Sequence, residues 1–112
     1  MKTQQFTYPF ASNHLATLSN VRYCQIGVER PFSIPLSVYD DSDNGTGKKW
    51  SDVPLTLRIT LDGTDTQTYT ISDKGILEFG DMYVDTNYQT LDIRILEPEN
   101  PYVIIDLAYE TV

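Results

Sequence analysis

The chain has 112 residues, of which 40% are hydrophobic and 21% are charged, and this composition fits one globular domain spanning residues 1–112. Sixteen acidic and eight basic residues give a net charge of −8, which opposes binding to nucleic-acid phosphates and to anionic lipid. No segment approaches the roughly 20 apolar residues of a membrane-spanning helix, so we expect neither a nucleic-acid partner nor membrane insertion.

The first residues, M-K-T-Q-Q-F-T-Y-P-F, contain neither the apolar core nor the cleavage site of a secretory signal, so we expect synthesis in the cytoplasm without a signal peptide. The aromatic residues Phe6, Tyr8 and Phe10 alternate with smaller residues, as in a strand. Pro9 cannot donate a ladder hydrogen bond, so this strand should lie at a sheet edge or against a neighbouring subunit. Residues 1–12 are therefore a candidate docking strand, and the three aromatic residues are candidate interaction residues.

Residues 14–18 are ambiguous, and residues 19–20 read S-N, which predicts a turn. Residues 21–28 are rich in strand formers, and Gly27 predicts a β-bulge within them. Cys24 is the single cysteine, so no disulfide can form within the chain. We expect Cys24 to be a small buried residue of this strand.

Residues 32–38 alternate between apolar and polar and predict another strand, which is followed by a polar loop over residues 40–49. The letters D-D-S-D-N-G from residue 40 resemble the start of an EF-hand calcium loop, but its twelfth position is Ser51 instead of glutamate. A solvated acidic loop is the simpler interpretation. We expect no cofactor, with one exception. Asp40, Asp41 and Asp43 are candidate ligands of a calcium ion.

The clearest signal is a β-hairpin. In residues 55–61, leucine and isoleucine occupy every second position, which is the period of a half-buried strand. Asp62 and Gly63 follow, and this dipeptide favours the type I′ turn that joins antiparallel strands. The return strand should direct Tyr69 and Ile71 inward and its threonines outward.

Alternating apolar residues predict further strands at residues 76–79, 91–95 and 102–109. The outer face of the last strand is half apolar, whereas the outer face of an exposed strand is usually polar. Either a loop or a partner therefore covers it, and Tyr102 and Ile104 are candidate interaction residues.

These short segments predict an all-β fold, a single-domain antiparallel β-sandwich of about 7–9 strands, with immunoglobulin-like and jelly-roll orders both open. The spacing D-G-T-x-x-x-x-Y-x-I-x-D-K-G-x-L-x-F, from Asp62 to Phe79, resembles the immunoglobulin-like modules of phage tail and baseplate proteins. The resemblance implies a structural role in such a particle.

Catalytic signals are weak. His14 is the only histidine, and it lies in the ambiguous segment, so a surface histidine is a better interpretation than a general base. The carboxylates of Asp92 and Asp106 could form a glycosidase pair, but both alternate with apolar residues and should lie on solvated faces with ordinary properties. We therefore expect a protein that is not an enzyme.

Two functions remain. The first is a structural or interaction protein, a subunit or adaptor of a larger assembly such as a virus or phage capsid, tail or baseplate. It would bind protein partners or form a homo-oligomer, and it would be incorporated into a virion. The alternative is a carbohydrate- or ligand-binding module, in which Tyr39 and Trp50 stack on the ligand. In this alternative the 40–45 loop binds a calcium ion that assists ligand binding.

Overall fold

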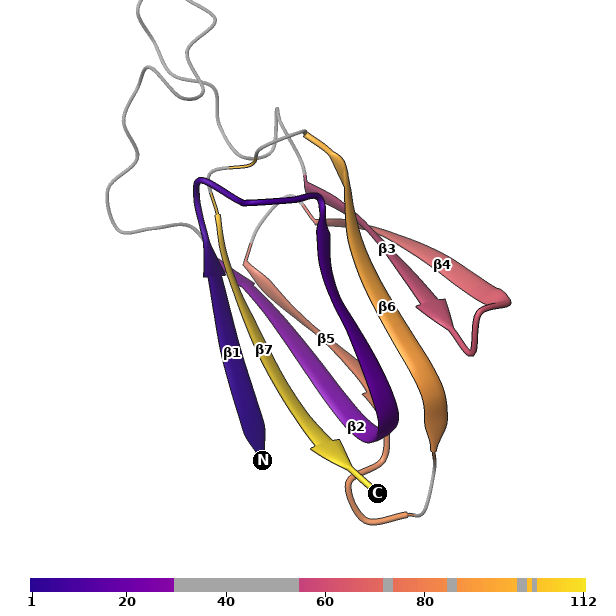
Figure 1. Ribbon diagram of the computed structural model, residues 1–112. Coiled ribbons are helices and arrows are strands. Elements are labelled where there is room, and N and C mark those ends of the chain that lie inside the picture. Colours follow the sequence, from indigo (N-terminus) through magenta and orange to yellow (C-terminus); the bar gives the residue numbers. More distant parts are fainter. Residues whose placement is uncertain (30–54, 72–73, 85–86, 99–100, 102) are drawn as a thin grey trace, which may run out of the picture.

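The chain folds into antiparallel β-strands, as Figure 1 shows for the computed structural model. The structure describes residues 1–29, 55–71, 74–84, 87–98, 101 and 103–112. Its strands are β1 (Lys2–Thr7), β2 (His14–Glu29), β3 (Leu55–Leu61), β4 (Asp65–Ile71), β5 (Gly75–Gly80), β6 (Tyr88–Glu97) and β7 (Ile104–Thr111). The predicted all-β antiparallel class is confirmed. Within these ranges there is no helix of the length and apolar character needed to cross a membrane.

The strands form one sheet in the order β1-β7-β2-β6-β3-β4, and β5 also pairs with β2. The first part of β2 pairs with β6, from His14 to Val21. The second part, from Val21 to Glu29, pairs with β7 on one side, and most of it pairs with β5 on the other. We call β6, β3, β4 and residues 14–20 the β6 half, and β1, β7, β5 and residues 21–29 the β7 half. In Figure 1, β2 descends beside β6, turns, and ascends beside β7 and β5.

The change of direction in β2 occurs at Asn20, which has a φ of 55°. Asparagine tolerates this left-handed conformation better than most residues. The turn signal at residues 19–20 therefore bends one long strand instead of separating two. The bulge predicted at Gly27 is wrong, because Gly27 continues the register on both sides and the irregular pairing lies between Val21 and Tyr23.

Both halves contribute their inward side chains to one hydrophobic cluster. Its buried members include Leu57 and Ile59 from the β6 half, and Ile26 and Ile105 from the β7 half. Cys24 is fully buried in the same cluster, as predicted, and its burial raises the pKa of the thiol to about 12. The thiol is thus uncharged and shielded from solution reagents at neutral pH.

The predicted hairpin is confirmed as β3 and β4, which pair continuously along their whole length. Asp62 and Gly63 have φ values of 53° and 73°, as a type I′ turn requires, and Thr64 N–H donates to the Leu61 carbonyl at 3.2 Å. Tyr69 and Ile71 are half-buried and pack against the core. The inward and outward faces follow the predicted alternation.

Candidate functional site

The aromatic residues predicted for docking lie in and just after β1, one of the two edge strands of the β7 half. Phe6 and Phe10 are half-buried and pack against the core of their own chain, whereas Tyr8 is 37% exposed. Ile104 is half-buried on β7, where it pairs with Thr7, while Phe6 pairs with the buried Ile105. Since neighbouring residues of a strand point to opposite faces, Phe6 and Ile104 lie on opposite faces of this half.

Other predicted site residues lie outside the described residues. These are the aromatic residues Tyr39, Trp50 and Tyr102, the candidate calcium ligands Asp40, Asp41 and Asp43, and the strand expected at residues 32–38. Their roles stay predictions. Within the described part of the chain, no group of three or more metal-ligating side chains gathers in one place.

A polar cluster on the β6 half joins β2 to β6. The Asp92 Oδ1 atom lies 2.7 Å from both His14 Nε2 and Thr17 Oγ1, and Arg94 Nε donates to Asp92 Oδ2 at 3.2 Å. Thr17 and Asp92 are direct partners across the strands, and His14 pairs with Arg94. Periodicity alone did not predict this cluster, because it depends on the register between strands that are distant in sequence.

The geometry of the cluster suits structure better than catalysis. In a catalytic triad of carboxylate, imidazole and hydroxyl, the carboxylate hydrogen-bonds to one nitrogen of the imidazole, and the other nitrogen activates the hydroxyl. Here the hydroxyl of Thr17 lies 2.8 Å from His14 Nε2, the same nitrogen that contacts Asp92. Partial burial would raise the pKa of Asp92, but hydrogen bonds from Thr17 and His14 and the charges of His14 and Arg94 lower it. The sequence predicted that Asp92 is a carboxylate with ordinary properties, whereas the structure shows that its anionic form is stabilised.

We predict that Asp92 makes stability depend on pH. Because the pKa of Asp92 is lowered in the folded state, its contribution is present above the unfolded-state pKa and is lost as the pH falls through the folded-state pKa. Urea unfolding of wild type and Asp92→Asn should therefore differ most near neutral pH and converge in acid. Thr17→Val, which removes one donor, should show part of the loss. A difference that stays constant down to acidic pH would contradict this assignment.

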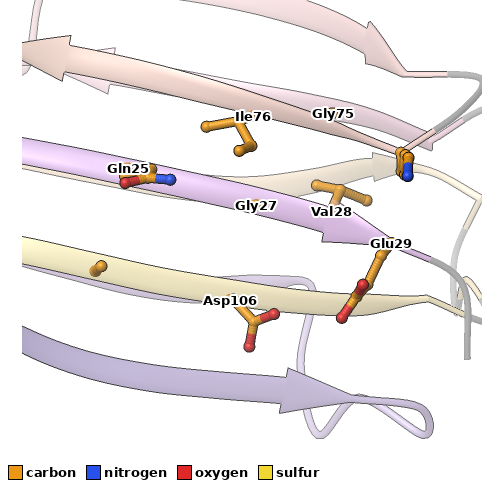
Figure 2. A pocket seen from close by; sticks show the side chains of 9 residues that line it. Gln25, Gly27, Val28, Glu29, Gly75, Ile76 and Asp106 are labelled. Atoms are coloured by element: carbon orange, nitrogen blue, oxygen red, sulfur yellow. The ribbon is translucent and has the colours of Figure 1, made fainter.

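A hollow of about 640 Å³ opens on the outer face of the β7 half, across β5, β2 and β7. Figure 2 shows its labelled residues: Ile76 on β5 lies on one side, Gly27 lies on β2 in the middle, and Asp106 on β7 lies on the other side. Ile76 is 61% exposed, although it is a large apolar residue. The hollow therefore offers apolar surface to solvent within a polar surround.

Small residues create this hollow. Gly27 has no side chain, and a Cβ atom added there would lie in ordinary contact, 3.8 Å from the Asp106 carbonyl oxygen and 3.9 Å from Asp106 Cβ. Ala108 also lines the hollow, where it pairs with Gln25 across β2 and β7. Gly27 in the sequence was interpreted as a bulge signal, whereas its structural effect is to leave space on the outer face.

A second, smaller hollow of about 410 Å³ adjoins the first across β7. Asp106 and Ala108 line both, and Gln5 on β1 contributes to the second. Gln5 Nε2 donates to Asp106 Oδ1 at 2.8 Å, so the carboxylate between the two hollows is held by β1. Together they form a furrowed surface that spans all four strands of the β7 half, which we call the outer furrow.

Comparison of the chain with protein families, with curated proteins and with solved structures gave no match.

Proposed function

We propose that the chain is a non-enzymatic subunit or adaptor of a larger protein assembly, such as the capsid, tail or baseplate of a virus or phage particle. The observation that carries the proposal is the outer furrow, where an exposed apolar residue, Ile76, lies beside a hollow on the outer face of a β-sheet. Protein interfaces combine such apolar centres with polar rims. Gln25, Glu29 and Asp106 supply a rim of this kind.

The polar cluster around Asp92 also supports a binding role over an enzymatic one. Its single imidazole contacts hydroxyl and carboxylate through one nitrogen. Asp92, the carboxylate that contacts this imidazole, has a lowered pKa and is stabilised as an anion, which weakens it as a base near neutral pH.

A carbohydrate-binding function lacks comparable support in the described residues. Sugar rings stack on aromatic side chains, and none of the described residues that line either hollow is aromatic. The aromatic residues suggested for this role, Tyr39 and Trp50, lie outside the described residues.

The experiment compares sedimentation of wild-type and variant chains in extracts of the cells that produce the protein. We expect the wild-type chain to sediment in a particle much larger than its own 12.8 kDa. A charge placed in the furrow by Ile76→Glu should move most of the chain to the slow fraction, because burying an unpaired carboxylate in an interface is costly. Ile76 is exposed, so the folded chain should tolerate the change.

Tyr83 provides the matched control. It is 93% exposed and does not line the furrow, so Tyr83→Glu adds the same charge to an exposed apolar position elsewhere. This variant should stay in the particle. A wild-type chain that sediments alone, or equal losses from the two variants, would overturn the proposal.

A further inference from the structure

The outermost strands of the sheet differ in how they are protected against pairing with another chain. Proteins usually block such edges with lysine, proline, bulges or short strands. β1 carries Lys2 and is followed closely by Pro9, and β5 carries Glu78 and follows Lys74. β4 has seven residues, D-T-Q-T-Y-T-I, with no lysine or proline, and its pairing with β3 shows no bulge.

We infer that β4 pairs antiparallel with β4 of a second copy of this chain, so that the β6 halves of two molecules form one continuous sheet. The inference rests on the proposed function, for which it supplies the first assembly step. Along the described strands, β3 is the only partner of β4, and its other edge has none. No described strand occupies the donors and acceptors of that edge, which are the groups that an added strand would use.

The sequence of β4 is complementary to itself. A two-fold axis at Thr68, the middle residue, lets all seven residues pair, with Thr66 opposite Thr70 of the second copy. Threonine pairs of this kind stabilise antiparallel sheets, and the hairpin already contains one, where the hydroxyl oxygens of Thr60 and Thr66 lie 3.3 Å apart. The threonine pairs between the two copies would thus be of the same kind as the threonine pair between β3 and β4 within one chain.

The charges near β4 also permit the approach of a second copy. The whole chain carries −8, which would repel another copy at most surfaces. In β4 the only charged residue is Asp65, and the two-fold pairing places it opposite Ile71 instead of another carboxylate. Arg58, a basic residue, pairs with Thr68 across the hairpin. β4 is therefore an edge at which acidic groups do not meet.

Cross-linking by an introduced cysteine tests this pairing. Residues on a two-fold axis of antiparallel strands have Cα atoms about 4.5–5.5 Å apart, a separation at which disulfides form. Thr68→Cys should therefore give a covalent dimer on mild oxidation of the otherwise native chain. Cys24 is the only natural cysteine and is fully buried, so it should not compete. Thr3→Cys, an exposed position on the β1 edge, is the matched control and should remain monomeric.

A second variant tests the association without a cross-link. Light scattering should show a monomer–dimer equilibrium for wild type, and Thr68→Lys, which opposes two like charges on the axis, should weaken it at least tenfold. Thr68 is exposed, so this change should leave the monomer folded. Failure of the Thr68→Cys chain to cross-link, or dimers that persist in Thr68→Lys, would overturn the β4 pairing. Particles that survive Thr68→Lys but are lost in Ile76→Glu would overturn the β4 pairing and leave the proposed function intact. β4 dimers in a wild-type chain that forms no particles would overturn the proposed function and leave the β4 pairing intact.

Discussion

Replacing Gly80 with alanine is expected to destabilise the protein by about 2–5 kcal/mol, the sum of a strained left-handed residue and a steric overlap. Gly80 ends β5 with a φ of +81°, and a Cβ atom there would lie 2.1 Å from the carbonyl oxygen of Arg22. That oxygen also accepts a hydrogen bond from Asp81 N–H at 3.3 Å, so it cannot easily move. Urea unfolding followed by circular dichroism measures the loss.

Gly63 provides the control for this prediction. Its φ of +73° is similar, but nothing lies within 4 Å of a Cβ atom added there. Gly63→Ala should therefore cost only the backbone strain, about 1–2 kcal/mol. Equal losses from the two substitutions would show that the contact with Arg22 relaxes without cost, contrary to our expectation.

Leu57→Ala should reduce the free energy of unfolding by about 2–5 kcal/mol, because it removes buried methyl groups and leaves a cavity. Leu57 is fully buried on β3, where it pairs with Tyr69 of β4 and Ile95 of β6. The loss is large beside the roughly 5–15 kcal/mol that stabilises a typical domain. A shift of the urea midpoint with an unchanged slope would identify it as a loss of native packing.

Ile76→Ala is the corresponding substitution at an exposed position. Ile76 is 61% exposed in the outer furrow, so its truncation should change stability by no more than about 0.5 kcal/mol. A similar loss at Ile76 and Leu57 would mean that the furrow is covered in the isolated chain. That result would also weaken the furrow as a partner-binding surface.

The features predicted well from sequence depend on residues close together in the chain. The hairpin is one, because the alternation over residues 55–61 and the Asp62-Gly63 turn specify both strands locally. The burial of Cys24 is another, because strand formers surround it within residues 21–28. In the hairpin the two-residue period identifies the inward face before any partner strand is known. For Cys24 the prediction rests on the tendency of free cysteine to be buried.

The features that sequence reasoning missed depend on pairing between distant strands. The cluster of His14, Thr17 and Asp92 exists only because β2 pairs with β6 in one register. The outer furrow requires Gly27 and Ala108 to meet on β2 and β7, and neither residue marks a cavity by itself. The bend at Asn20 was predicted as a turn, but only the pairing on both sides shows that the strand continues.

The sharing of β2 between both halves also determines when it can be paired during synthesis. Its partners among the described strands, β5, β6 and β7, begin at or after Gly75. At the usual pace of translation, a nascent chain that has released β2 waits on the order of seconds before the first partner emerges. Meanwhile β3 and β4 can close into their hairpin, whereas the apolar face of β2, with Val21, Ile26 and Val28, stays exposed. On the ribosome, β2 is therefore a segment that a chaperone would protect until β5 emerges.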